Sequence, residues 1–233
     1  MAVRRDRTPQ LAAPPGRHRD DGHALWRYAD RVAVRCHRCD TPGWVTGPTD
    51  SRRFRCLGCS EALDGGCGCG RCRPSAWVGP ARYSGYRPWG YCGHKWVSAE
   101  VHRARATAPL RTLSADCSQC GRSSEVDVTL SRWRGNEAID PDFGLPLRLV
   151  EKTAAGLLWA YNAEHLQALH DYATATLREG SGHHRSMFSR LPPWMKLARN
   201  RVLLQRAVAR LQRRLLGERS HCRRAWALLS GNL

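Results

Sequence analysis

The feature that most constrains the fold is a pair of Cys-x-x-Cys motifs, Cys36–Cys39 and Cys56–Cys59, with sixteen residues between them. A Cys-x-x-Cys turn directs two thiolates at one point, and two such turns complete a tetrahedral four-sulfur shell for Zn2+. Strand-favouring side chains flank both motifs, namely Val32, Val34, Trp44, Val45 and Phe54. We therefore predict that Cys36, Cys39, Cys56 and Cys59 bind one zinc ion at the tips of short hairpins. The alternative is a set of reduced structural thiols or a disulfide pair.

Metal sites of this kind supply folding free energy to modules that have little apolar core. The chain has 233 residues but only 3 Phe, so one large hydrophobic core is not expected. We predict an α+β protein in which small zinc-stabilised β modules precede a C-terminal helical region. The predicted segments are a flexible basic arm (1–23), a zinc ribbon (24–64), a second Cys/His-rich zinc module (65–122), a β segment (123–160) and a basic helical region (161–233).

The N-terminal sequence and the paired cysteines together predict a cellular compartment. The N-terminal sequence has no apolar signal-peptide core, and the chain has no apolar run of about 18 residues that would span a bilayer. Thiols stay reduced in the cytoplasm, where paired cysteines more often bind metal than form disulfides. We therefore expect a cytoplasmic protein with no membrane partner.

Ten of the 11 cysteines lie between positions 36 and 120. A glycine-rich stretch after the ribbon holds three of them: Cys67, Cys69 and Cys72. Three thiolates leave a zinc site one ligand short. Cys92 and His94 either complete a second site with Cys117 and Cys120, which we favour, or close the glycine-rich cluster. We expect two zinc sites, and whether the glycine-rich cluster forms a third is an open alternative.

The chain carries a net charge of +18 that is unevenly distributed. Residues 36–122 carry +7, residues 123–180 carry −4, and residues 181–233 carry +11. Concentrated positive charge is the electrostatic signature of a polyanionic partner, most simply DNA or RNA.

The basic C-terminal region includes an amphipathic stretch over residues 197–215. At 100° per residue, Leu197, Leu204, Val208, Leu211 and Leu215 share one face. Four arginines fall on the opposite face: Arg199, Arg206, Arg210 and Arg213. This face could contact nucleic acid, lie on a membrane surface or be solvated. The purely aliphatic apolar stripe makes the membrane interpretation the weakest.

Aromatic and basic side chains also alternate between the cysteines of the second module. Such a mixture suits base stacking combined with phosphate contact. It predicts that nucleic acid is contacted by Arg82, Arg87, Tyr83 and Tyr86. The alternative is a small core around the metal, which we favour for Trp89 and Trp96.

Further along the chain, residues 149–160 predict two strands around a turn. Asn162 predicts the N-cap of a helix that ends at Gly180. His165 and His170 are five residues apart on this helix, and we interpret them as polar surface residues.

Beyond the ribbon, the chain contains the segments DFGLPLRL, LLWAYNAEHLQALHDYATATLRE and RLPPWMKLARNR. In this order it resembles a bacterial group of TFIIB-type zinc-ribbon-containing proteins over roughly residues 30–215. The resemblance implies metal binding and no particular biochemical role. The second cysteine segment is similar to treble-clef-like zinc modules, although Cys92 and His94 are separated by a single residue.

The sequence contains no Walker loop, no Gly-x-Ser-x-Gly and no His-Glu-x-x-His. Asp140, Asp142 and Glu151 could gather a hard metal for phosphodiester chemistry, but their spacing does not show that they meet. We therefore expect a non-catalytic zinc protein that binds nucleic acid, DNA rather than RNA, and has no small-molecule substrate. The alternative is an adaptor that docks on a larger DNA-processing, transcription or defence complex.

Overall fold

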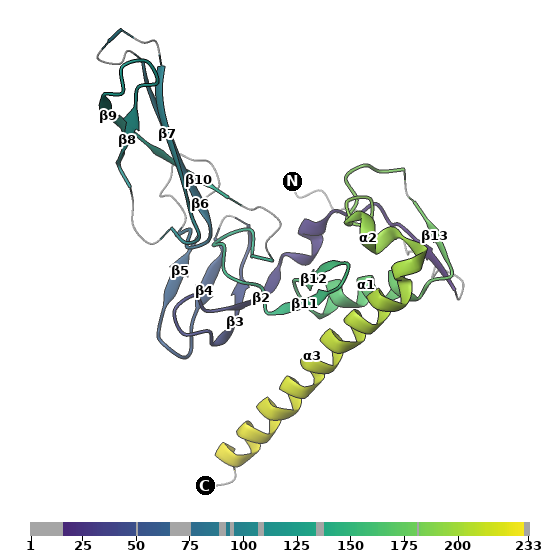
Figure 1. Ribbon diagram of the computed structural model, residues 1–233. Coiled ribbons are helices and arrows are strands. Elements are labelled where there is room, and N and C mark those ends of the chain that lie inside the picture. The colour runs from purple at the N-terminus through teal and green to yellow at the C-terminus, as the bar shows by residue number, and fades with distance from the viewer. Residues whose placement is uncertain are drawn as a thin grey trace, which may run out of the picture. The chain divides into compact units, whose positions relative to one another are not determined.

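The computed structural model describes residues 16–49, 51–65, 76–88, 92–93, 96–106, 110–133, 138–180 and 182–230, with side chains of the last helix described up to Leu216 (Figure 1). The chain forms two compact units, one spanning 30–150 and one combining residues up to 29 with 151–233. Small sheets and helices are both present, which confirms the α+β class. The unit boundaries differ from the five predicted segments.

The ribbon segment of the first unit is a four-stranded antiparallel sheet in the order β2-β3-β4-β5. Its strands are β2 (Arg31–Arg35), β3 (Pro42–Thr46), β4 (Arg53–Arg55) and β5 (Ala62–Asp64). The side chains of Val32, Val34, Val45 and Phe54 are fully buried. These are the strand-favouring residues that flank the cysteines, so the same side chains form the strands and the small core between them.

The same unit holds a second, three-stranded sheet in the order β10-β6-β7. Its strands are β6 (Ala81–Pro88), β7 (Trp96–Arg103) and β10 (Thr129–Arg132), and a separate hairpin consists of β8 (Thr112–Asp116) and β9 (Ser123–Asp127). The hairpin packs on the sheet through Val97, Ala115, Cys117 and Val126. The predicted β segment 123–160 is therefore not a separate module, because β9 and β10 pair with strands of the preceding one.

The second unit contains most of the helical structure. Its elements are η1 (Leu25–Tyr28), α1 (Ala163–Thr174), α2 (Pro193–Lys196), η2 (Ala198–Asn200) and α3 (Arg201–Ser230). The predicted hairpin is present as β11 (Leu149–Thr153) and β12 (Gly156–Ala160). The N-cap is also confirmed, because the Asn162 side chain accepts a hydrogen bond from the backbone N–H of His165 at 2.8 Å.

Helix α1 ends at Thr174 rather than at Gly180. The residues beyond it form β13 (Leu177–Glu179), which pairs in parallel with β1 (Arg17–Arg19). The backbone groups there satisfy their hydrogen bonds across strands instead of continuing the helix.

The same pairing corrects the prediction that residues 1–23 form a flexible arm, because residues 16–23 are part of the fold. Asp20 is buried and accepts a hydrogen bond from the Ser186 hydroxyl at 2.6 Å. The His18 ring packs edge-on against Phe188 at 4.3 Å. Strand pairing and these side-chain contacts outweigh the polar composition that suggested disorder, whereas residues 1–15 lie outside the described part.

Helix α3 is amphipathic, as predicted. Leu204, Ala207, Val208 and Leu211 have no solvent exposure, and α1 and α3 pack against each other. Among the described residues, the helices are either too short or too polar to cross a membrane.

Candidate metal centres and charged surfaces

The first candidate metal centre consists of the four ribbon cysteines. Their sulfur atoms all lie within 4.8 Å of one another. The Sγ atoms of Cys39 and Cys56 are 3.4 Å apart, and those of Cys36 and Cys59 are 3.6 Å apart. A disulfide would need about 2.05 Å, whereas a tetrahedral metal with bonds of about 2.3 Å separates its sulfurs by about 3.8 Å. The spacing fits four ligands of one ion, and all four cysteines are free thiols in this structure.

Both Cys-x-x-Cys motifs reach this geometry through the same backbone turn. The N–H of Cys36 donates to the carbonyl of Thr41 at 3.0 Å, and the residue between Cys39 and Thr41, Asp40, has a φ of 59°. Ser60 holds the matching position after the second motif, also with a φ of 59°. A left-handed residue reverses the chain directly after the second cysteine, so each turn presents both thiols on one side.

Backbone amides also point at the sulfur atoms. The N–H of Arg38 lies 3.5 Å from the Cys36 sulfur, and the N–H of Gly58 lies 3.3 Å from the Cys56 sulfur. Donors in this position stabilise the thiolate form, which is the form that binds metal.

The thiols differ in acidity because each has different hydrogen-bond partners and neighbours. A hydrogen bond with the Thr41 hydroxyl lowers the pKa of Cys39 to about 6. The hydrogen bond from the backbone N–H of Glu61 lowers the pKa of Cys59, but the neighbouring Cys39 and burial outweigh it and raise this pKa to about 12. Four thiolates so close together repel one another, and a bound cation would relieve this repulsion.

The second candidate centre brings together cysteines from two hairpins. The sulfur atoms of Cys92, Cys117 and Cys120 lie within 4.8 Å of one another, and those of Cys92 and Cys117 are 3.4 Å apart. Cys117 repeats the ribbon turn: its N–H donates to the carbonyl of Arg122 at 3.0 Å, and Gly121 is left-handed with a φ of 69°. Asp40, Ser60 and Gly121 thus share one conformation. Asp, Ser and Gly are all turn-forming residue types, so their place directly after a Cys-x-x-Cys motif is a sequence signal for this turn.

The position of Cys92 agrees with the favoured assignment, in which it joins the Cys117–Cys120 pair. The fourth predicted ligand, His94, lies outside the described residues, as do the three cysteines of the glycine-rich cluster: Cys67, Cys69 and Cys72. A treble clef places a helix after a zinc-binding hairpin. The described residues between 76 and 133 contain strands and no helix.

The aromatic residues predicted to contact nucleic acid have different environments. Tyr83 is buried beside Trp77 and Ala81, so the prediction that it stacks on bases is wrong. Tyr86 is 67% exposed and packs edge-on against Trp96 at 5.3 Å. Trp96 is itself 51% exposed, which contradicts its interpretation as a core residue.

The arginines predicted beside these rings lie on the same sheet. The Arg82 guanidinium lies 3.1 Å from the carboxylate of Glu100 on the neighbouring strand. Arg87 is exposed near the end of β6. Arg82 is therefore already part of an ion pair, and Arg87 is the more exposed of the two cations.

The four arginines predicted to share one face of the C-terminal helix have different environments. Arg206 and Arg213 are exposed on α3, and Arg199 is exposed in the preceding 3-10 turn. Arg210 instead donates to the nearly buried carboxylate of Glu151 at 2.5 Å, and Arg214 donates to the other oxygen at 2.5 Å. The helical wheel could not show this pairing, because Glu151 belongs to strand β11. Arg210 is thus corrected from a candidate nucleic-acid contact to one arm of a structural ion pair.

The three carboxylates considered for a hard metal each have local partners. Asp140 is buried and accepts hydrogen bonds from the backbone N–H groups of Asp142, Phe143 and Leu145. Burial raises the pKa of Asp140 to about 6. Each carboxylate is thus used locally: Asp140 orders its own loop, Asp142 lies 3.4 Å from the Arg52 guanidinium, and Glu151 holds the two arginines of α3.

His165 is buried rather than exposed on the helix surface. Its Nδ1 accepts a hydrogen bond from the Tyr161 N–H at 3.2 Å, and its ring stacks on Tyr28 at 4.9 Å. Burial lowers its pKa to about 3, so the ring is neutral at physiological pH. Its surface interpretation was wrong because periodicity alone did not show that Tyr28 covers this face.

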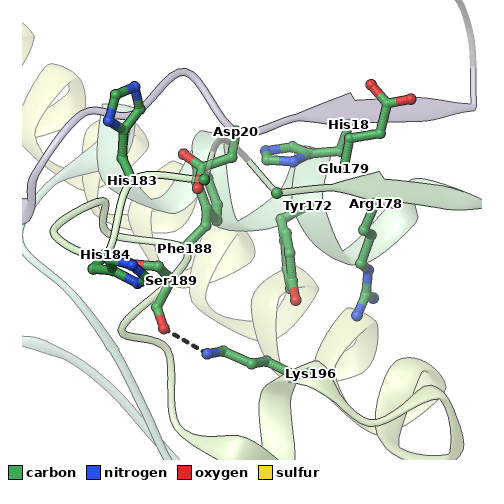
Figure 2. Close-up of a pocket in the computed structure, with 12 residues that line it drawn as sticks. His18, Asp20, Tyr172, Arg178, Glu179, His183, His184, Phe188, Ser189 and Lys196 are labelled. Atoms are coloured by element: carbon green, nitrogen blue, oxygen red, sulfur yellow. Dashed lines mark hydrogen bonds between the residues drawn. The ribbon is translucent and has the colours of Figure 1, made fainter.

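A pocket of about 290 Å3 lies in the same unit (Figure 2). Its polar and aromatic lining includes His18, Asp20, Tyr172, Arg178 and Lys196, which come from distant parts of the sequence. Figure 2 shows the Lys196 ammonium directed at Ser189, whose carbonyl accepts a hydrogen bond at 2.6 Å. No sequence pattern identifies this pocket, because its residues share no motif and no periodicity.

These observations establish two groups of cysteines that could hold a metal ion. The resemblance to TFIIB-type zinc-ribbon-containing proteins stays a prediction. No protein-family model, curated protein or solved structure matches the chain.

Proposed function

We propose that this chain is a non-catalytic zinc protein that binds nucleic acid. Sulfur-only, tetrahedral sites favour zinc over harder cations such as Mg2+ and Ca2+, which take oxygen ligands. Four cysteines fill all positions of the first site, so an ion there would hold the hairpins together and leave no open position for a reacting water. The second site would be closed in the same way by His94.

The observation that carries nucleic-acid binding is the solvent-facing side of α3. Arg206 and Arg213 are exposed, and they lie seven residues or about 10.5 Å apart along the helix. The opposite side, with Leu204, Val208 and Leu211, is fully buried, so these two cations are held on a fixed surface. Two guanidinium groups carried by one side of a helix can contact phosphates of one nucleic-acid backbone.

The charge around this helix favours the same partner. Residues 181–233 contain 12 arginine and lysine residues but a single carboxylate, Glu218. Each phosphate that such a surface neutralises releases counterions, so the contacts contribute affinity without base specificity.

The test is the salt dependence of nucleic-acid binding. We expect the double variant Arg206→Gln with Arg213→Gln to weaken binding to every probe sequence and to reduce the slope of log K against log salt by about 1.5. Arg210 is left unchanged because its loss would disturb the fold. The matched control, Arg19→Gln with Arg185→Gln, removes the same charge from exposed positions outside α3. Fluorescence anisotropy with labelled 20-mers measures the affinity of the parent and both variants at several salt concentrations between about 50 and 300 mM. Over this range the affinity of a phosphate-binding surface should fall by roughly several powers of ten.

The outcomes separate the possibilities. An unchanged slope in the α3 variant would show that this face is only solvated. An equal effect in the control would show that binding follows total charge and not this helix. If the parent protein binds neither single-stranded nor duplex probes, the proposal is wrong and the adaptor alternative takes its place.

A further inference from the structure

The pocket in Figure 2 has a basic end and an acidic end. The hydroxyl of Tyr172, the guanidinium of Arg178 and the ammonium of Lys196 lie at the lower end of the view. The Asp20 carboxylate lies at the upper left, away from them. The three basic-end side chains come from α1, β13 and the end of α2, so packing of these elements brings them to one cavity. A few polar groups that converge on a cavity are typical of a small-molecule site.

The two cations at the basic end have no carboxylate partner among the described residues. The Arg178 guanidinium donates to the carbonyls of Met195 at 3.3 Å and Ala173 at 3.5 Å. The Lys196 ammonium donates to the Ser189 carbonyl at 2.6 Å. A guanidinium has five N–H donors and an ammonium has three, so both keep donors for a ligand. The carbonyl partners hold the two side chains in place but leave their charges unneutralised.

Tyr172 contributes a hydroxyl to the same end. The Arg178 guanidinium lies over the Tyr172 ring, 4.2 Å from its centroid, and Phe188 stacks on this ring at 5.2 Å. These contacts fix the ring in the fold, where Tyr172 is buried. Within the described part of the chain, its hydroxyl has no hydrogen-bond partner. The hydroxyl is therefore available to a ligand in the pocket.

The carboxylates that line the pocket are already paired with other groups. Glu179 lies 2.9 Å from the Arg17 guanidinium, and Figure 2 shows its carboxylate at the top of the view, away from the basic end. Asp20 accepts hydrogen bonds from the Gly22 N–H at 2.9 Å and from the Ser186 hydroxyl at 2.6 Å. The basic end therefore carries two positive charges that neither carboxylate neutralises through an ion pair.

We propose that the basic end of this pocket binds a phosphate monoester. At neutral pH a monoester carries a charge of about −1.5 to −2, which matches two cations, whereas a carboxylate or a phosphodiester carries a single negative charge. Its terminal oxygens accept hydrogen bonds from several directions, and the guanidinium, the ammonium and the hydroxyl supply the donors.

The size of the cavity limits what carries the phosphate. A volume of about 290 Å3 is at the lower end of the range for small-molecule sites. Two sources share this chemistry: a free small phosphate monoester and the 5′-phosphate at the end of a nucleic-acid strand. The inference goes beyond the proposed function and does not depend on it, because the backbone phosphates of a nucleic acid are diesters.

The test measures binding of methyl phosphate by isothermal titration calorimetry. We expect Lys196→Gln to weaken binding by at least about tenfold, because a charged contact is lost. Lys196→Arg keeps the charge and should bind more tightly than Lys196→Gln. Tyr172→Phe keeps the ring but removes the hydroxyl, and it should weaken binding by roughly three- to tenfold. The matched control is Lys152→Gln, which removes the same charge from an exposed position on β11 of the same unit.

The diester gives a second comparison. Dimethyl phosphate should bind the parent protein at least about tenfold more weakly than methyl phosphate, because it has one negative charge less. Circular dichroism of each variant shows that the fold is intact. An oligo-dT strand with and without a 5′-phosphate identifies the source of the ligand. A preference for the phosphorylated strand that Lys196→Gln abolishes would support a strand end, and equal affinities together with methyl phosphate binding would support a free small molecule.

Three results would overturn the inference. The first is a parent protein that does not bind methyl phosphate. The second is binding that Lys196→Gln and Tyr172→Phe leave unchanged, because the phosphate would then lie elsewhere. The third is an equal loss in Lys152→Gln, because binding would then follow total charge. Each of these results leaves the proposed function standing, since that function is tested with the α3 variant and its salt dependence.

Discussion

The sulfur atoms of Cys92 and Cys117 lie 3.4 Å apart although 25 positions separate them in the chain. Cys92 follows β6 and Cys117 follows β8, so a shared metal would tie the two hairpins together at their tips. The apolar contact between these hairpins is small, with Val97, Ala115 and Val126 at its centre. We therefore expect the metal to contribute much of the free energy that holds this part of the chain together.

The first prediction concerns the members of this centre. Cys92→Ser and Cys117→Ser should each remove the same zinc ion, because both sulfurs belong to one shell. Cys69→Ser should leave that ion in place. Metal analysis of the purified variants measures the zinc bound per chain, and loss of this ion in Cys69→Ser would favour the assignment that merges Cys92 with the glycine-rich cluster.

The ribbon centre gives a second prediction. Cys39→Ser should remove one zinc ion and open the amides of β2–β5 to hydrogen exchange, because three thiolates hold zinc more weakly than four. Elements of the other unit, such as α1, should keep their protection. Unchanged zinc content in this variant would contradict the assignment of Cys39 as a ligand.

The third prediction concerns Glu151, which accepts hydrogen bonds from Arg210 and Arg214. Glu151→Gln should lower the free energy of unfolding by about 1 to 2 kcal/mol, because the negative charge and one of the two oxygens that accept hydrogen bonds from the arginines are lost. Glu164→Gln is the control: Glu164 is largely exposed and lies 3.9 Å from Arg27, so little stability should change. Urea unfolding of both variants provides the comparison, and equal stabilities would show that the pair is not structural.

The fourth prediction is a pH dependence from His165. Its pKa is about 3 in the folded chain and about 6.5 in the unfolded chain, so the unfolded chain binds more protons below pH 6.5. Stability around α1 should therefore fall as the pH drops, by about 2 kcal/mol between pH 7 and pH 5.

Hydrogen exchange of the α1 amides at both pH values measures this effect without interference from zinc release in the other unit. His165→Gln keeps an acceptor for the Tyr161 N–H but does not titrate, so its α1 protection should vary much less over this range. The same pH dependence in the variant would assign the effect to another group.

Local sequence patterns determined much of the fold. The spacing of Cys36, Cys39, Cys56 and Cys59, with strand-favouring neighbours, was enough to predict the hairpins and their four-sulfur centre. Asn162 identified the start of α1, and the leucine periodicity identified the buried face of α3. In each case the signal works because the residues that interact are close in sequence or related by the period of one element.

Only the tertiary structure decided the features that depend on partners from distant segments. It placed Tyr83 under the β8–β9 hairpin but left Trp96 exposed, although both lie in strands with similar neighbours. It also showed that residues 17–19 pair with β13, that Tyr28 stacks on His165, and that Arg210 donates a hydrogen bond to Glu151. A helical wheel or a strand pattern specifies which side chains share a face, whereas the chain segment that covers that face is determined by packing between elements far apart in the sequence.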